Sequence, residues 1–577
     1  MFEEFFKHDK LLYRGEKMKR SKPVILLMTV LLAAIAVVFG RNEIGMRNFP
    51  FSVIVTSDGG QEELRCMKLD GEYYMFLPSY AEEEKLHICT NLIYDVSIDG
   101  RQLLRNQSCS EFPVNTKLEL CFRSPGNEGC ETVTFVQSRN VATVYIDVPS
   151  GNMDYIHEKK SNAEAASVRV YTANGTLDYS GSAESLKGRG NATWEAEKKS
   201  YSLTLLGEAD LLGMGQAQRW VLLANAYDSS HIRNKIAYDA AKAGLSFTPE
   251  TCWVDLYLNG EYAGLYLLSE RNEVHPERVG ISAESGFLVS RDLLYRMEEQ
   301  GYPHIKTENG VAFRIHHSAL SHQELQTVWQ SVENAILAEN GIDPVSGKSW
   351  EELIDLDSWA HKFLLEELFC NFDAGFVSQY FYADTSVSPA KIYAGPIWDF
   401  DNSMGRGSWV FSNPGAVAAN RPSFPSDGVS LFYYLYQKEA FRKRVTELFS
   451  SVYEPMMQEL MNCTIREYAE FVAPAASANQ IRWNIGDVEK YTERIVDFLR
   501  NRTEIFHDFW VNETAYCTVE FLENLQLQGF WMVRKGSVLT GLPEAEGSVW
   551  YDTTAGEPFD VTQPVWEDMC LSLQTES

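Results

Sequence analysis

The chain has 577 residues, of which 23% are charged, and a formal net charge of −29. This composition is typical of a globular protein, and the length is too great for one domain. The excess of acidic residues argues against nucleic acid as a partner, because a phosphate backbone requires a basic face. The acidity suits a soluble domain at a cell surface, although charge alone does not predict a fold.

The N-terminus contains a candidate membrane segment. Residues 23–40 are apolar apart from Thr29, which is near the lower length limit for a membrane-spanning helix. The residues just before this run include Lys17, Lys19, Arg20 and Lys22. The positive-inside rule then places residues 1–22 in the cytoplasm and the bulk of the chain outside the cell. A signal peptide cleaved after residues 34–36 is the alternative, but the apolar run continues past that site, which favours a single-pass anchor in the cell membrane.

Residues 45–150 are predicted to form a β-rich, sandwich-like module. Residues 51–55 and 133–136 alternate between apolar and polar, and turn residues separate the short strands. Residues 144–148 are predicted as its last strand, before a linker. Five of the ten cysteines lie in this module, which permits disulfides outside the cell. These five are Cys66, Cys89, Cys109, Cys121 and Cys130.

Residues 165–275 are predicted to form a sheet with one long helix. Strands are expected at residues 167–171, 200–206, 220–223, 253–258 and 262–268. Asn259-Gly260 joins the last two and is a strong hairpin signal. A helix is expected over about residues 230–243, with Asp228 or Ser229 as its N-cap and Gly244 at its end.

Residues 320–515 are predicted to be mostly helical. Apolar residues recur every three or four positions in 321–339, 357–370, 431–453 and 488–510. One β-hairpin interrupts the helices, with strands at residues 377–383 and 391–397. Residues 516–577 are β-rich again, and their pattern resembles the small β repeats appended to Gram-positive surface proteins. We interpret them as an accessory module.

Two acids one residue apart follow the second hairpin strand. Asp399 and Asp401 come directly after Trp398, and Asn402 follows them. Carboxylate oxygens are the ligands that Mg²⁺ prefers, so this loop is a candidate metal site. Upstream, Asp373 follows a predicted helix. Helix, acid, hairpin and second acid occur in this order in protein kinases, although the sequences H-R-D, D-F-G and G-x-G-x-x-G are absent.

Several blocks in the middle of the chain carry a resemblance to the CotH kinase family, which is named for a spore coat protein and is related to the atypical protein kinases. The resemblance covers about residues 163–515. The blocks are residues 187–194 with 198–201, 220–225 with Asp228, 232–234, 258–266 with Glu270, 371–373 and 398–401.

The resemblance implies ATP-dependent phosphotransfer and assigns the nucleotide-binding roles. Lys199 or Lys198 would contact the phosphates, and only one of them can enter the cleft because neighbours on a strand face opposite ways. Glu270 would orient that lysine. Arg189 would add positive charge near the phosphates, and Trp398 would wall the nucleotide site. Arg233 is either a phosphate ligand or part of a structural ion pair.

The resemblance also assigns the catalytic and metal-binding acids. Asp373 would accept the proton of the attacking hydroxyl, and Asp399 would hold Mg²⁺ with Asp401 or Asn402 as a second ligand. One position departs from ordinary kinases, which place a metal-binding Asn five residues after the base. Ser378 occupies that position here, which leaves the second metal contact and the level of activity open.

The expected fold is therefore α+β, with a two-lobed atypical kinase-like core flanked by two β modules behind one N-terminal transmembrane helix. The expected function is transfer of phosphate from ATP, with Mg²⁺, to Ser or Thr of a secreted, surface or coat protein. A catalytically weak or inactive kinase-like scaffold or adhesion protein is the alternative. A glycosyltransferase ranks lowest, because its D-x-D motif usually follows an α/β nucleotide-binding half. His316, His317 and His322 fit no standard metal site.

Overall fold

The computed structural model describes residues 51–575, except 83–85, 91–94, 104–106, 109–112, 125–126, 423–428, 525 and 544–547. The predicted cytoplasmic segment 1–22, the predicted anchor 23–40 and Cys109 lie outside the described residues. Within the described part of the chain, no helix combines the length and the apolar character that crossing a membrane requires.

The N-terminal module consists of two sheets that share one hydrophobic core. Val53, Leu120 and Val133 are buried there, as the alternating pattern predicts. Cys121 and Cys130 form a disulfide between paired strands of the second sheet. The first sheet contains β2 (Gly60–Arg65), β1 (Phe51–Ser57), β5 (Leu86–Thr90) and β8 (Gln107–Ser108). The second contains β3 (Met67–Leu69), β4 (Glu72–Leu77), β10 (Asn127–Gln137), β9 (Lys117–Ser124), β6 (Asp95–Ile98) and β7 (Arg101–Leu103).

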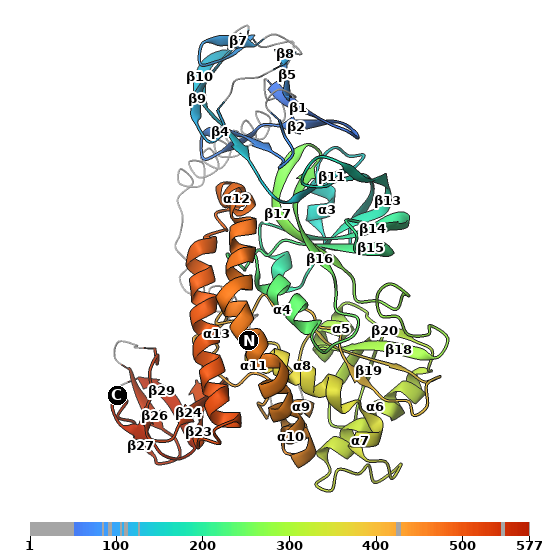
Figure 1. Ribbon diagram of the computed structural model, residues 1–577, viewed down its shortest axis with the longest axis vertical. Coiled ribbons are helices and arrows are strands. Elements are labelled where there is room, and N and C mark those ends of the chain that lie inside the picture. Colours follow the sequence, from blue (N-terminus) through green and yellow to red (C-terminus); the bar gives the residue numbers. More distant parts are fainter. Residues whose placement is uncertain are drawn as a thin grey trace, which may run out of the picture.

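A closed barrel of seven strands follows the N-terminal module (Figure 1). Its order is β11 (Ala142–Asp147), β12 (Ala163–Tyr171), β13 (Leu177–Arg189), β14 (Ser200–Asp210), β15 (Gln216–Leu223), β17 (Glu261–Glu270) and β16 (Thr251–Leu258). The assignment of residues 144–148 to the N-terminal module is therefore wrong. β11 pairs with β12 and in parallel with β16, and its mainly apolar sequence suits a strand buried on both faces. Asn259 and Gly260 form the predicted turn, both with positive φ.

Helix α4 (Arg233–Ala241) crosses from the barrel to the five-stranded sheet and helices beneath it, which we call the lower lobe (Figure 1). It begins later than predicted. Its N-cap residue is Ile232, which makes no side-chain cap bond. Asp228 instead accepts a hydrogen bond from the backbone N–H of Arg233 at 3.1 Å, so it satisfies a helix-end donor from outside the cap position. Short α3 (Asp154–Glu158) and the 3₁₀ turn η3 (Ala192–Trp194) lie at the barrel edge.

The lower lobe contains a sheet of five strands, and the sequence pattern predicted only two of them. The predicted hairpin is present as β21 (Gln379–Asp384) and β22 (Tyr393–Ala394). Its other strands, which were not predicted, are β18 (Gly286–Arg291), β19 (His304–Lys306) and β20 (Ala312–Ser318). One face packs into the main core through Val289, Phe313 and Phe381. Short α5 (Leu294–Glu299) connects β18 and β19.

The remainder of the lower lobe is helical. α6 (His322–Leu337) begins with a capping box formed by Ser321 and Glu324. The single helix predicted over residues 431–453 is wrong, because α9 (Leu431–Tyr436) ends before Lys438 and a new helix starts. The helices are α7 (Trp350–Leu353), α8 (Leu356–Leu368), α10 (Glu439–Leu448), α11 (Glu454–Glu459), α12 (Ile465–Trp483) and α13 (Val488–Trp510), with π-helical segments η4 (Phe449–Tyr453) and η5 (Leu460–Thr464).

The C-terminal β module packs against α13 and shares its core with the helical lobe (Figure 1). Trp531 is buried and donates its indole N–H to the carbonyl of Val410 at 2.8 Å. The module is thus joined to the lobe more closely than an appended repeat requires. Its strands are β23 (Tyr516–Glu523), β24 (Gln526–Arg534), β25 (Ser537–Val538), β26 (Ser548–Asp552), β27 (Glu557–Pro558), β28 (Pro564–Val565) and β29 (Met569–Thr575).

Candidate functional site

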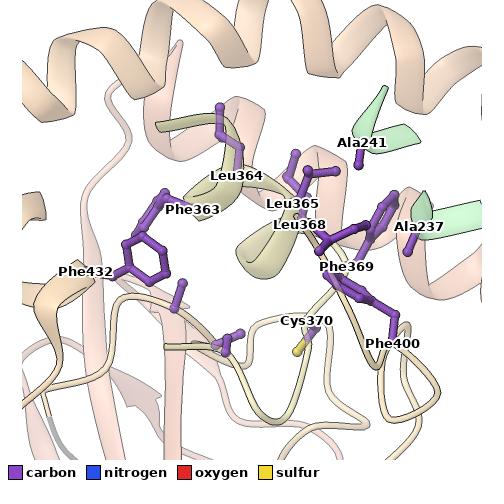
Figure 2. Close-up of a cluster of buried hydrophobic side chains, with 14 of the residues drawn as sticks. Ala237, Ala241, Phe363, Leu364, Leu365, Leu368, Phe369, Cys370, Phe400 and Phe432 are labelled. Carbon is purple, nitrogen blue, oxygen red and sulfur yellow. The ribbon is translucent and has the colours of Figure 1, made fainter. Parts of the chain in front are cut away.

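The loop that carries Asp399 is fixed by helix α4. The hydroxyl of Tyr238 accepts a hydrogen bond from the backbone N–H of Asp399 at 3.3 Å, and the side chain of Asn234 accepts from Phe400 N–H at 2.8 Å. The backbone of Asp399 has φ 71°, a left-handed conformation that residues other than glycine rarely adopt without such support. Phe400 is buried beside Ala237 of α4 and Phe369 at the end of α8 (Figure 2). The core therefore holds this loop in place.

Asp373 lies on the adjacent loop, which follows α8. Its backbone N–H donates to the side chain of Asn371, and the N–H of Phe372 donates to the carbonyl of Asn402 at 3.0 Å. The second bond ties the Asp373 loop directly to residues 398–402, which we call the metal loop after the role predicted for it. The sequence-predicted order of helix, acid, hairpin and acid thus brings Asp373 and Asp399 into one site, as the kinase comparison requires.

The acids of this site repel one another. Burial and the charge of Asp399 raise the pKa of Asp373 to about 7. Burial and the same neighbour also raise the pKa of Asp401 well above its usual value, while Arg406 opposes the shift. Raised pKa values such as those of Asp373 and Asp401 are characteristic of functional sites, and a divalent cation would relieve the repulsion between the acids.

The remaining polar groups of the metal loop differ in where they point. The hydroxyl of Ser378 donates to Asp399 at 3.2 Å, so the residue that replaces the kinase Asn faces the metal loop. The side-chain oxygen of Asn402 accepts a hydrogen bond from Arg406, whose Nη1 also donates to the carbonyl of Asp401 at 3.3 Å. Asn402 is thus engaged by an arginine, whereas Asp401 shares its electrostatic field with Asp399.

Arg189 and Trp398 lie beside these acids. The guanidinium of Arg189 is 5.3 Å from the ring centre of Trp398, which stacks on Tyr238 at 5.9 Å. Burial lowers the pKa of Arg189, and the charge of Asp399 opposes that shift. The structure therefore brings Arg189, Trp398 and Asp399 together, as the resemblance implies.

Two further arginines, Arg271 and Arg314, surround the same space. Burial raises the pKa of Tyr380, and Arg314, Arg271 and Arg189 all oppose that shift, so the three guanidinium groups gather around one phenol. Arg314 stacks on Tyr302 at 3.5 Å. Across the described part of the chain, none of the three makes a side-chain hydrogen bond or ion pair. We call Arg189, Arg271 and Arg314 the arginine cluster.

The lysines behave differently from the expectation. Lys198 is 1% exposed and donates to the carbonyls of Ala224 and Leu265, which places its ammonium inside the lobe. Lys199 contacts a different part of the chain, just before β14, and donates to the carbonyl of Trp194 at 2.5 Å. In the described residues neither lysine contacts the acids of the metal loop.

The predicted pairing of Glu270 with a lysine is wrong in this structure. Glu270 forms an ion pair with Arg278 at 2.6 Å and accepts the backbone N–H of Glu250 at 2.9 Å. The ammonium of Lys198 meets β17 at the carbonyl of Leu265, whereas Glu270 stands at the end of that strand beside Arg278. Burial nevertheless raises the pKa of Glu270 to about 7.

Arg233 is part of a structural ion pair, one of the two roles that its sequence position left open. Its guanidinium pairs with buried Asp228, and its Nε donates to the carbonyl of Ser403 at 3.0 Å. Arg233 thereby links the start of α4 to the end of the metal loop. It stabilises the site rather than facing the arginine cluster.

Arg271, Arg314 and Tyr380 are the site residues that the sequence reasoning missed. Arg314 lies on β20, opposite Ser290 of β18, and Ser290 is opposite Tyr380 of β21. Arg314, Ser290 and Tyr380 therefore share one face of the sheet, whereas Arg271 follows β17. An alternating pattern over residues 312–316 could have revealed this face, but β18 and β20 had not been assigned as strands, so no pattern connected these side chains.

The described residues thus combine a closed barrel, a crossing helix and a largely helical lobe, with acids on the two loops that follow α8 and β22. The family model described as CotH kinase protein matches residues 186–506, and the chain belongs to this CotH kinase family. The match lies within the region 163–515 that the sequence blocks indicate. A comparison with curated proteins gave no match.

Proposed function

We propose that this protein transfers phosphate from ATP, with Mg²⁺, to Ser or Thr of a secreted, cell-surface or coat protein. The arginine cluster carries this proposal. Three guanidinium groups without hydrogen-bond partners among the described residues gather around Tyr380, and one of them, that of Arg189, interacts with the charge of Asp399. The three arginines are half-buried, and a polyanion such as a triphosphate would pair with them. The acids of the metal loop match the oxygen ligands of Mg²⁺.

The residues divide the work of such a transfer as follows. The arginine cluster binds the phosphates, and Trp398 covers the nucleotide. Asp399 holds Mg²⁺ with Asp401, since Asn402 is engaged by Arg406. Bound Mg²⁺ supplies charge neutralisation on the phosphate oxygens. Asp373, with a pKa of about 7, accepts the proton of the acceptor hydroxyl. The acceptor oxygen then bonds to the γ-phosphorus as the bond to the ADP oxygen breaks.

One observation favours the second candidate, a weakly active or inactive kinase-like scaffold or adhesion protein. The lysine–glutamate ion pair of ordinary kinases is not formed here, because Lys198 is buried and Glu270 pairs with Arg278. If the protein is an active kinase, the arginine cluster makes the phosphate contacts that the lysine makes in ordinary kinases. The two candidates therefore differ in whether Arg271 and Arg314 bind nucleotide.

The proposed location is the cell membrane, with one N-terminal pass and the bulk of the chain outside the cell. The apolar run at residues 23–40 and the basic residues before it support this proposal. The net charge of −29 is consistent with a surface protein and with no role for nucleic acid. Its partners would then be the membrane and a protein acceptor.

The test is phosphate incorporation by the purified full chain with ATP, Mg²⁺ and a Ser/Thr-rich acceptor. Asp399→Asn should reduce the rate by about 100-fold or more, the scale seen when a group that stabilises transition-state charge is removed. Arg314→Met should raise the KM for ATP about tenfold, while Arg466→Gln, at a half-exposed arginine of α12, should leave it unchanged. Equal rates for Asp399→Asn and wild type would exclude the kinase proposal, and turnover of a nucleotide sugar but not ATP would favour a glycosyltransferase.

Nucleotide binding separates the two candidates even without turnover. A thermal shift with ATP and Mg²⁺ that disappears in Arg314→Met shows that the arginine cluster binds nucleotide. The absence of a shift in the wild type would support the scaffold.

A further inference from the structure

A cavity lies beside the end of the metal loop and is lined by residues 404–407. It has a volume of about 650 Å³, which is in the range of ligand-binding sites. Its walls come from the segment before α4, from residues 404–414 after the metal loop, and from α13. The side chains that matter for its chemistry are Tyr227, Arg406, Tyr491, Arg494, Asp497 and Phe498.

The charge balance of this cavity is positive, in a protein whose net charge is −29. Arg494 is exposed on α13 and stacks on Tyr491 at 5.2 Å, and within the described residues it makes no hydrogen bond or ion pair. The acid in the wall, Asp497, pairs with Arg500 at 2.7 Å. The second cation of the wall is Arg406, which stacks on Tyr227 at 5.5 Å and uses its Nη1 to hold Asn402 and Asp401. An anion is therefore the ligand that this cavity favours.

Arg406 connects the cavity to the transfer site. The same guanidinium that lines the cavity donates to the side chain of Asn402 and to the carbonyl of Asp401. A group bound there would thus lie one side chain away from the metal loop. The tyrosine and phenylalanine rings of the wall provide apolar surface for a peptide next to the anion.

We propose that this cavity binds a phosphorylated Ser or Thr of the acceptor polypeptide while a second hydroxyl of the same polypeptide reacts. This inference rests on the proposed kinase function. Two arginines from separate elements suit a phosphate group, which accepts several charge-assisted hydrogen bonds, better than a single carboxylate. The reaction itself produces that group on the acceptor. Acceptors with several closely spaced Ser or Thr residues would then be modified repeatedly.

Binding can be measured without ATP or Mg²⁺, so it does not depend on catalysis. Fluorescence anisotropy of the full chain would compare a labelled Gly/Ser peptide that carries one phosphoserine with its unphosphorylated and glutamate-containing counterparts. The phosphopeptide should bind at least tenfold more tightly than either. Phosphopeptide binding that persists in a protein without ATP turnover would support the cavity and reject only the kinase proposal.

Three variants locate the bound peptide. Arg494→Gln should weaken phosphopeptide binding about tenfold, whereas Asp497→Asn removes the acid of the wall and should strengthen it. Arg466→Gln, at a half-exposed arginine of α12 that does not line the cavity, should change nothing. Because the first two effects have opposite signs, misfolding cannot produce both.

Three results would overturn the proposal. One is equal affinity for the phosphorylated and unphosphorylated peptides. Another is binding that is lost in Arg314→Met but kept in Arg494→Gln, which would place the peptide on the arginine cluster. The third is inorganic phosphate that competes with an affinity equal to that of the phosphopeptide, which would mean that the polypeptide adds nothing.

Discussion

At the scale of single residues, burial determines which charged groups in this protein can do chemistry. Lys198 is buried beside β17 of the barrel, and this burial lowers the pKa of its ammonium well below the usual lysine value. Its ammonium is satisfied by two backbone carbonyls, so replacing it leaves those acceptors without a partner. Lys199 lies at the edge and contacts the turn around Trp194. The two neighbours therefore serve different purposes.

Substitution of each lysine by methionine should separate these purposes. Lys198→Met should destabilise the protein by roughly 1–3 kcal/mol, because two buried carbonyls lose their donor. Lys199→Met should change stability by less than about 0.5 kcal/mol. Urea unfolding curves give both values. A Lys199→Met variant with normal stability but strongly weakened ATP binding would contradict the structure and restore the kinase-like lysine role.

Asp255 predicts a pH dependence of stability. Burial raises the pKa of Asp255 to about 7, against the opposing hydrogen bond from Tyr262 and the charge of Lys198. The folded state therefore holds a proton that the unfolded state has already lost, so stability falls as the pH rises from about 4 to about 7. Asp255→Asn should remove this fall, worth roughly 4 kcal/mol at about 1.4 kcal/mol per pKa unit.

The measurement is the free energy of unfolding in urea at pH 5 and pH 8 for both proteins. The difference between the two pH values should be smaller in Asp255→Asn, whatever the absolute stability of the variant. An unchanged difference would mean that Asp255 titrates normally in the folded state.

At the scale of secondary structure elements, α4 is the element on which the site depends. Asn234 and Tyr238 lie one turn apart and hold the backbone of the metal loop, while Ala237 and Ala241 face α8 (Figure 2). Small side chains on this face let the two helices approach closely. Any change that moves α4 therefore moves Asp399.

Gly244→Ala should disturb this helix contact. A Cβ at Gly244 would lie 2.0 Å from the ring of His361 in α8, and that ring is fixed by its hydrogen bond with Tyr453. We expect a loss of about 1–3 kcal/mol in stability from overpacking, together with weaker nucleotide binding as α4 shifts. Gly207→Ala is the control, because its Cβ meets nothing within 4 Å. Thermal unfolding with and without ATP measures both effects, and equal behaviour of the two variants would refute the dependence of the site on α4.

The elements that could be predicted from the sequence are those with a strong local signal. α13 spans residues 488–510 as predicted, because a long amphipathic repeat specifies a helix by itself. The Asn259-Gly260 hairpin was equally local. By contrast, β18 and β20 became recognisable only through their pairing with β21, and Arg314 reached the site through that sheet. The proximity of Asp373 and Asp399 could be predicted because their order along the chain carries information, whereas the partner of Glu270 depends on tertiary structure.

At the scale of the whole molecule, the segment after the metal loop lies between the helical lobe and the C-terminal module. Arg502 of α13 pairs with Glu367 of α8 and donates to the carbonyls of Pro414 and Ala416. On the other side, Met532 donates to Gly415 at 2.7 Å. The C-terminal module thus completes the structure around residues 414–417, which continue from the metal loop.

Trp531→Ala should consequently destabilise the whole protein and not the C-terminal module alone. Trp531 is 1% exposed, packs on Phe521 at 4.5 Å and donates to Val410. The expected loss is about 3–5 kcal/mol, the usual cost of truncating a buried tryptophan. Trp566→Ala is the matched control in the same module, since Trp566 is 65% exposed and should change the free energy of unfolding by less than about 0.5 kcal/mol.

Differential scanning calorimetry should show the transition of the helical lobe moving to lower temperature with Trp531→Ala, because the lobe and the C-terminal module share one core. If only a separate, small transition moved and ATP still protected the lobe as in wild type, the module would be an independent domain, and residues 414–417 would hold their position without it.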